Sequence, residues 1–191
     1  MRVKDDQKEA LLFAGTLALV SRVGLSGLTV PLIAKQSGVA TGTVYVYFKS
    51  KDDLIRALFK DVKHRFASNL FAGHQPGKPV KESLRALWEN GLRYMATHYE
   101  EQIFREQFNA SPYRREEENV DYGLRLMGPL LDVLHTGQEQ GLIKADREDL
   151  LLCVFFGLLL RLAEGARENP ALLHKAMLGK TFQYFWDAIK A

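Results

Sequence analysis

Four hydroxyl-bearing side chains gather in residues 41–47, which read T-G-T-V-Y-V-Y. Thr41, Thr43, Tyr45 and Tyr47 can each donate and accept hydrogen bonds through these hydroxyl groups. Groups of this kind bind phosphate oxygens and base edges in the major groove of DNA. The chemistry that the segment indicates is therefore hydrogen bonding to a nucleic acid.

Two short helices joined by a tight turn are predicted to position these side chains. Thr29 stands where an N-cap precedes the first helix, and Pro31 lies in its first turn, where a missing N–H costs no intrahelical hydrogen bond. Gly38 lies in the turn, where glycine adopts backbone conformations that other residues resist. Val44 and Phe48, four residues apart, are predicted to face inward and to leave the hydroxyl-bearing side chains pointing away. A plain helical hairpin with incidental tyrosines is the alternative interpretation.

The stretch 29–54 resembles the N-terminal pattern of the TetR family of transcriptional regulators, roughly T-x-x-x-I-A-x-x-A-G-V-S-x-G-x-[LIV]-Y-x-Y-F-x-S-K-x-x-L. The matching positions are Thr29, Ile33, Ala34, Gly38, Val39, Gly42, Val44, Tyr45, Tyr47, Phe48, Ser50, Lys51 and Leu54. The resemblance covers about residues 8–60, a third of the chain. Ser37 departs from a usual alanine, and Ala40 stands where the family often has serine.

The resemblance implies an all-α fold with two domains. An N-terminal three-helix helix-turn-helix DNA-binding domain is expected at residues 1–50, followed by a connecting helix at about 51–70. A larger C-terminal helical domain at 71–191 is expected to bind an effector and to form a homodimer. The implied function is that of a cytoplasmic transcriptional regulator, an effector-responsive repressor that binds a pseudo-palindromic operator in double-stranded DNA.

The same resemblance assigns the expected DNA contacts. Thr29, Tyr47 and Lys51 are expected to bind backbone phosphates. Ala40 begins the recognition helix without the hydroxyl that a serine brings there. The residues expected to face the groove are Thr41, Gly42, Thr43 and Tyr45. The two threonines are expected to discriminate between bases, and the glycine is expected to let the backbone approach the duplex.

Charge is distributed unevenly along the 191 residues. The chain carries 26 Lys and Arg against 23 Asp and Glu, a net charge of +3. Residues 1–66 hold 11 of the basic and 6 of the acidic side chains, so this third has a net charge of +5. Such a balance suits a polyanionic partner, because neutralisation of phosphates by Lys and Arg dominates affinity for nucleic acids. It also falls within the ordinary scatter for a segment of this length.

Longer helices are predicted after a turn-rich segment at 72–79. Their expected spans are 80–98, 100–109, 114–140, 146–168 and 171–189. Gly128 and Pro129 are predicted to interrupt the third of them, because glycine and proline both weaken a helix interior.

The helix at 146–168 is apolar on all sides, and such a helix must be covered all round. We expect a partner subunit to cover one face in a four-helix bundle; burial within one subunit is the alternative. The expected interface residues are Cys153, Gly157, Leu160, Leu178, Phe182, Phe185 and Trp186.

Aromatic and methionine side chains on the central helices are candidates for the lining of an effector pocket. The candidates are Trp88, Leu92, Tyr94, Met95, Phe104, Phe108, Met127, Leu131, Phe155, Phe156 and Leu159. They favour a small apolar or aromatic effector. An aromatic stripe at helical spacing is also typical of a solid core, so both interpretations stay open here.

Other function classes find little support in the sequence. It contains no G-x-S-x-G, H-E-x-x-H, P-loop or G-x-G-x-x-G motif. The only cysteine, Cys153, lies among bulky apolar neighbours in the sequence and is expected to be inert. We therefore expect no enzymatic activity, no cofactor and no metal. The longest apolar run, 150–160, is shorter than the roughly 20 residues that span a bilayer, so no membrane partner is expected. A helical module whose N-terminal hairpin binds protein is the remaining alternative.

Overall fold

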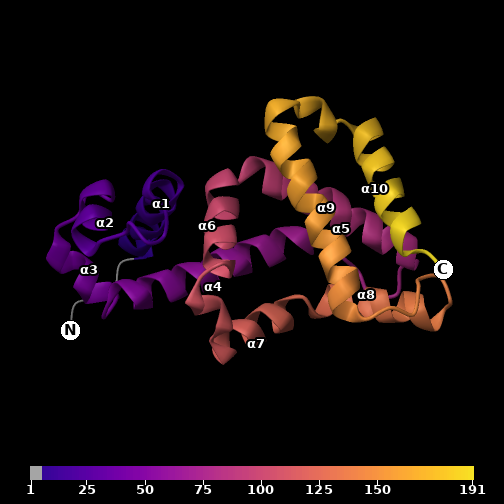
Figure 1. The fold of residues 1–191 in the computed structure, drawn as a ribbon, viewed down its shortest axis with the longest axis horizontal. Helices are drawn as coiled ribbons and strands as arrows, with labels where there is room; N and C mark the ends of the chain where they lie inside the picture. Colours follow the sequence, from indigo (N-terminus) through magenta and orange to yellow (C-terminus); the bar gives the residue numbers. More distant parts are fainter. Residues whose placement is uncertain (1–5) are drawn as a thin grey trace. The chain divides into compact units, whose positions relative to one another are not determined.

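The computed structural model describes residues 6–191, apart from the side chains of Asp6, Glu117 and Asn119. In this range the α-helices are α1 Asp6–Val23, α2 Val30–Gln36, α3 Thr41–Tyr47, α4 Lys51–Leu70, α5 Val80–Thr97, α6 Tyr99–Asn109, α7 Glu117–Leu126, α8 Gly128–Glu139, α9 Glu148–Glu168 and α10 Lys175–Ile189. Two 3-10 helices, η1 Pro112–Arg115 and η2 Pro170–Leu173, complete the regular elements (Figure 1). The expected all-α fold is confirmed. Residues 1–5 of the expected first domain lie outside the described range.

Two compact units make up the chain. The N-terminal unit comprises the residues up to Lys63 together with Tyr99–Tyr122, and the C-terminal unit comprises His64–His98 and Gly123–Ala191. This division differs from the expected one at residue 71, because α6, η1 and the start of α7 belong to the N-terminal unit. The boundary within α4 falls after Lys63, so this one helix supplies residues to both units.

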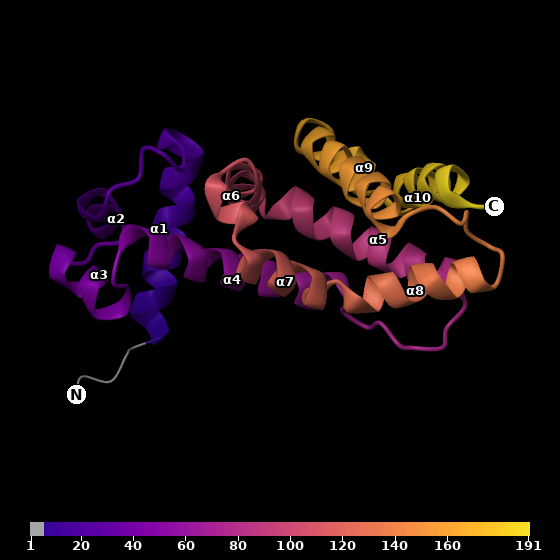
Figure 2. The same cartoon turned by 60° about the horizontal axis from the view of Figure 1, so that its bottom comes forward.

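In the N-terminal unit, α1, α2 and α3 lie side by side, as Figures 1 and 2 both show. Apolar side chains from each element meet in one core, among them Leu12 of α1, Ile33 of α2 and Leu54 of α4, all fully buried. Phe108 of α6 belongs to this core and stacks on Phe59 of α4, with 3.9 Å between ring centroids. Helix α6 therefore completes a core that the first four helices would leave open.

The C-terminal unit is built around Trp88 of α5, whose side chain is fully buried. Its indole ring stacks on Phe185 of α10 at 4.9 Å and meets the edge of Phe155 of α9 at 5.8 Å. The indole Nε1 donates a hydrogen bond of 3.2 Å to Thr181 Oγ1, which satisfies the one polar atom of the ring. Helices α5, α9 and α10 thus pack around a single aromatic centre.

Helix boundaries follow local chemistry. The predicted interruption at Gly128 and Pro129 is confirmed, because α7 ends at Leu126 and α8 begins at Gly128. The predicted helix over 171–189 is divided at His174, whose extended backbone (φ −68°, ψ 146°) separates η2 from α10. Within residues 6–191, no helix combines the length and the apolar character needed to cross a membrane.

Candidate nucleic-acid interface

The turn between α2 and α3 is fixed by backbone chemistry that the sequence predicts. Thr29 Oγ1 accepts a hydrogen bond of 3.3 Å from the N–H of Leu32, so Thr29 is the N-cap of α2. Gly38 has φ +67°, a left-handed conformation that favours glycine. The N–H of Val39 then donates to the carbonyl of Ala34 at 3.0 Å and closes the turn. These contacts hold α3 in a defined orientation against α2.

One face of α3 is open to solvent. Val44 is 1% exposed and anchors the helix to the core, whereas Tyr45 is 56% exposed. Thr41 and Gly42 are exposed and Thr43 is half-buried. A Cβ built on Gly42 meets no atom within 4 Å, so the backbone itself is accessible at this residue. The structure thus presents the side chains of Thr41 and Tyr45, which bear hydroxyl groups, and an uncovered backbone on the same short helix.

Tyr47 differs from expectation. Its side chain is 8% exposed and belongs to the core, where its ring lies 6.4 Å from that of Phe48. The expectation that Tyr47 points away from the core is therefore wrong for the ring. The reason is helical spacing: Tyr47 follows Val44 by three residues and lies on the same face.

Val46 takes an outward position and is 50% exposed. Val46 is not among the expected DNA contacts, although its spacing of four from Gly42 places the two on one face. An exposed valine in this position is suited to contact a thymine methyl group.

Lys51 occupies the first turn of α4 and is partly buried. Its ammonium donates a hydrogen bond of 3.2 Å to the carbonyl of Leu28, in the loop before α2. An ammonium carries three N–H donors, so this contact leaves capacity for a phosphate oxygen. Lys51 therefore ties α4 to the loop that carries Thr29.

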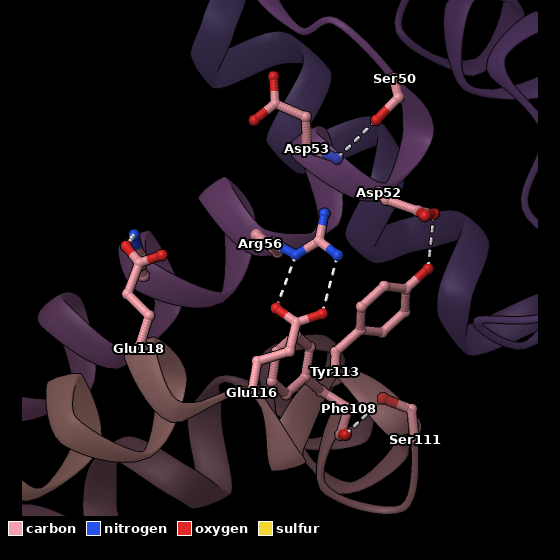
Figure 3. Close-up of polar contacts among 10 residues, drawn as sticks. Ser50, Asp52, Asp53, Arg56, Phe108, Ser111, Tyr113, Glu116 and Glu118 are labelled. Atoms are coloured by element: carbon pink, nitrogen blue, oxygen red, sulfur yellow. Dashed lines mark hydrogen bonds and ion pairs between the residues drawn. The ribbon is translucent and has the colours of Figure 1, made fainter.

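Two hydrogen bonds between side chains and backbone cap the start of α4. Ser50 Oγ accepts from the N–H of Asp53 at 3.1 Å, and Asp53 Oδ2 accepts from the N–H of Lys49 at 2.9 Å. The first bond satisfies an N–H group that the first turn of a helix leaves unpaired, and the second satisfies the N–H of the residue two positions before the helix. Figure 3 shows Ser50 and Asp53 at this position.

A polar cluster fixes the first half of α4 within the N-terminal unit (Figure 3). Arg56 donates two hydrogen bonds, of 2.7 and 2.8 Å, to the carboxylate of Glu116. The hydroxyl of Tyr113 donates to Asp52 Oδ1 at 2.7 Å. Burial, together with this hydrogen bond, raises the pKa of Tyr113 to about 12. Sequence reasoning missed the cluster because 60 residues separate Arg56 from Glu116 and no local signal relates them.

The sequence matches two family descriptions: "Bacterial regulatory proteins, tetR family" over residues 8–58, and "Tetracyclin repressor-like, C-terminal domain" over residues 79–190. The chain belongs to the TetR family. This TetR-family protein is a helix-turn-helix transcriptional regulator that binds DNA, and its relatives are regulators rather than enzymes.

Three similar proteins illustrate the family. An uncharacterised helix-turn-helix transcriptional regulator of Haemophilus influenzae is 27% identical over 190 residues, which cover 99% of this chain and 98% of the relative. The crystal structure of a TetR family transcription regulator from Marinobacter aquaeolei matches with a TM-score of 0.91 and 26% identity, over 100% of this chain and 99% of that chain. FadR from Bacillus subtilis, crystallised with stearoyl-CoA, shares the fold at 19% identity and a TM-score of 0.66, over 94% of this chain and 98% of that chain.

The residues expected to form the dimer interface fall into two groups in this TetR-family regulator. Those on α10 are buried in their own unit, where they face α5 and α9. The expectation that they are available to a partner subunit is therefore wrong. They are Leu178, Phe182, Phe185 and Trp186, exposed by 0%, 2%, 0% and 8%. On α9, Cys153 and Gly157 are exposed and Leu160 is half-buried.

Cys153 has apolar neighbours in the sequence, but the expectation that they surround its side chain is wrong, because the buried face of α9 is formed by residues at positions 151, 155 and 159.

The candidate pocket residues also divide. Those buried in the core of the C-terminal unit are Trp88, Leu92, Tyr94, Met95, Met127, Phe155 and Leu159. Phe156 is partly buried and packs against them, and Leu131 is half-buried. Phe104 and Phe108 belong instead to the core of the N-terminal unit, so grouping them with the others is wrong. Spacing of four on α6 predicts a buried face correctly but does not show which core that face enters.

Proposed function

We propose that this TetR-family regulator is an effector-responsive repressor that binds a pseudo-palindromic operator as a homodimer. The observation that supports this most is the open face of α3, backed by the buried Val44. Two copies of α3 in a two-fold dimer would read two half-sites about one helical turn of DNA apart, or somewhat more. A repressor of this kind acts by occupying the operator until an effector lowers its affinity.

Base discrimination is assigned to the open face of α3. Thr41 and Thr43 bring hydroxyl groups to base edges, and each good polar base contact contributes roughly 1–3 kcal/mol of discrimination. Gly42 lets the backbone come close to the duplex, and Tyr45 borders the same surface. Ala40, at the N-cap of α3, makes no side-chain cap bond of its own.

Phosphate binding is assigned to the residues that flank this face. Thr29 is exposed, and its hydroxyl hydrogen can donate while its oxygen caps α2. Lys51 contributes through its ammonium, and Tyr47 contributes through its hydroxyl while its ring packs in the core. These contacts orient the protein on the duplex and carry no sequence information.

The experiment that tests this assignment compares variants on operator DNA. The operator is selected from random duplexes, with DNA from upstream of the protein's own gene as a first candidate, and affinity is measured by fluorescence anisotropy. Thr43→Ala is expected to lower operator affinity about tenfold and to relax preference at one base position. Thr136→Ala, an exposed threonine of α8, is the matched control and should bind as the wild type does. Equal affinities for all three proteins would contradict the assignment.

Salt dependence separates phosphate contacts from base contacts. Lys51→Ala should weaken binding to all sequences alike and lower the salt slope by about one unit. An unchanged slope would remove Lys51 from the interface. A helical module that binds protein, the alternative function, would show no steeply salt-dependent affinity for duplex DNA.

Dimer formation is assigned to the outward face of α9. Leu150 is 52% exposed and Leu158 is 38% exposed, although both are large and apolar. Gly157, directly before Leu158, is also exposed, and a Cβ built there meets no atom within 4 Å. Tyr184 of α10 is 60% exposed. A second copy of the chain would cover this apolar surface without disturbing the core, because the buried face of α10 already packs within its own unit.

The effector is proposed to be a small apolar or aromatic molecule that binds in the C-terminal unit. The support is the concentration of aromatic and methionine side chains there, including Trp88, Met95 and Phe155. FadR, which shares the fold, was crystallised with stearoyl-CoA, a ligand with a long apolar chain. An effector that prefers a conformation with wrongly spaced recognition helices would lower operator affinity by its differential binding energy. Native mass spectrometry of the purified protein would reveal a retained ligand, and its mass would narrow the class.

A further inference from the structure

Val46 is an apolar side chain on a helix face that otherwise offers hydroxyl groups and accessible backbone. It is 50% exposed, whereas Val44, two residues earlier in the same helix, is 1% exposed. In the described part of the N-terminal unit, Val46 belongs neither to the core nor to the partly buried apolar side chains that pack against it. The fold therefore gains little from a valine at this position, because apolar surface stabilises a protein only where it leaves water.

Helix propensity does not account for this valine either. Branching at Cβ makes valine a weaker helix former than alanine, and α3 spans only seven residues. The same branching holds the side chain of a helical valine in essentially one rotamer, so its two methyl groups point in a fixed direction. Little side-chain entropy is then lost when they pack against another molecule. Val46 is thus unfavourable for the helix but well prepared to contact an apolar group.

The segment that carries Val46 suits a polyanionic partner. Residues 29–51 contain three lysines, Lys35, Lys49 and Lys51, and no acidic residue. The first two lysines are exposed, and the third is partly buried. Positive charge of this kind favours nucleic-acid phosphates. In the proposed function, on which this inference rests, the surface meets the major groove of duplex DNA.

The major groove offers one apolar group to such a side chain. Base edges present hydrogen-bond donors and acceptors there, and only thymine adds a methyl group, at C5. Cytosine carries a hydrogen at C5, unless it is methylated to 5-methylcytosine. A valine placed over a donor or acceptor would leave that group unpaired, at a cost in affinity. A methyl group under the same valine loses no hydrogen bond.

We propose that Val46 reads the C5-methyl group of one thymine in each half-site of the operator, and that it accepts the same methyl group on 5-methylcytosine. The contact complements the hydroxyl groups of Thr41 and Thr43, which form hydrogen bonds but do not distinguish a methyl group from a hydrogen. Burial of one methyl group against Val46 corresponds to about fourfold in affinity.

Uracil scanning of the selected operator tests the proposal. Each thymine is replaced in turn, at the equivalent position of both half-sites, by deoxyuridine, which keeps the base pair and removes only the methyl group. Fluorescence anisotropy of the full chain should show one position at which the wild type loses about 15-fold in affinity, since two methyl groups are removed. Val46→Ala should bind the thymine operator more weakly and show no further loss with uracil at that position.

Val23→Ala is the matched control. It removes the same two methyl groups from a valine of α1 that is 44% exposed, so it should keep the wild-type loss with uracil. Val46→Ala is expected to fold, because the position is exposed and alanine is the better helix former.

A second measurement adds the methyl group instead of removing it. Cytosine or 5-methylcytosine, each paired with guanine, replaces the thymine at the position that the scan identifies. The wild type should bind the methylated duplex about 15-fold more tightly than the unmethylated one when both half-sites carry the change. Val46→Ala should bind the two duplexes alike.

Four results overturn the proposal while leaving operator recognition intact. They are an operator without thymine, a wild type that no uracil weakens, a uracil loss that Val46→Ala retains, and equal weakening of Val46→Ala on the thymine and uracil duplexes. The third assigns the methyl contact to another residue, and the fourth assigns Val46 to the sugar–phosphate backbone. If random duplexes yield no preferred operator, the proposed function fails and this inference fails with it.

Discussion

The position of η1 against α4 depends on the phenolic hydroxyl of Tyr113. It donates to Asp52 at 2.7 Å, and the guanidinium of Arg56 lies 5.4 Å from the centre of the same ring. Tyr113→Phe keeps the ring and removes only the donor. Because the acceptor is a charged carboxylate in a partly buried position, we expect a loss of about 1–2 kcal/mol in the free energy of unfolding.

Urea denaturation measures this loss. Tyr45→Phe is the matched control, since Tyr45 is 56% exposed and its loss of a hydroxyl should leave stability unchanged. If both variants unfold at the same urea concentration as the wild type, the bond between Tyr113 and Asp52 contributes nothing.

Lys63 gives the regulator a specific dependence on pH. Its pKa is lowered from 10.5 to about 8 by burial and by Arg105 and Arg114. Between these two pH values the unfolded chain binds a proton that the folded chain has released, so stability from this group rises with pH in that window. Below it, both states are protonated and the unfavourable burial of the charge is present in full.

Lys63→Met should lack this rise. The free energies of unfolding of wild type and variant are measured with urea at several pH values. The difference between the two free energies should shrink by no more than about 3 kcal/mol as pH increases through the window. Parallel stability curves would contradict the lowered pKa.

Local residue chemistry accounts for what could be predicted at this scale. The cap at Thr29 and the left-handed Gly38 depend on neighbours within four residues, so the sequence predicts them. The pair of Arg56 and Glu116 depends on contacts between distant segments and leaves no local signal. Tyr47 was misplaced because a tyrosine can bury its ring and keep its hydroxyl near the surface, and residue type alone does not decide between these roles.

At the level of elements, the crossing of α1 and α2 depends on Gly15. A Cβ added there would lie 2.2 Å from Ser37 Oγ and 3.2 Å from Ser37 Cα. Gly15→Ala should therefore force the helices apart and destabilise the protein by about 1–3 kcal/mol. Thermal unfolding measures the change.

Ser37→Ala tests the cause of that change. The hydroxyl of Ser37 is buried and has no hydrogen-bond partner among the described residues, so its removal alone should be neutral or stabilising. Because the hydroxyl is also the nearest atom to the added methyl group, the double variant should recover part of the stability lost in Gly15→Ala. Additive effects of the two substitutions would show that the clash lies elsewhere.

Periodicity predicted the helices themselves but not what covers them. The stripe containing Leu178, Phe182 and Phe185 identifies a buried face of α10, yet it cannot show whether that face meets its own unit or a second subunit. The structure assigns it to its own unit. Similarly, the pair of Phe104 and Phe108 indicates a buried face of α6 without indicating that it closes the N-terminal core.

For the whole molecule, the outward face of α9 decides the oligomeric state in our proposal. Leu158→Glu places a charge on that surface and should dissociate the dimer, because an unpaired carboxylate is costly to bury in an apolar interface. Sedimentation velocity at micromolar concentration should show a dimer for the wild type and a monomer for the variant. Leu142→Glu is the control, since Leu142 is 42% exposed in the loop before α9. A monomeric wild type would refute the assignment.

The N-terminal unit is assembled from two stretches of chain that are separated by α5, and this has a consequence for biosynthesis. Phe104 and Phe108 are fully buried in its core, and they leave the ribosome only after α5 has been translated. A nascent chain that ends before Tyr99 lacks both rings, so the DNA-reading unit should not reach its final packing until later residues emerge. For the same reason, a chimaera that takes its helix-turn-helix from one relative would also need α6 from that relative.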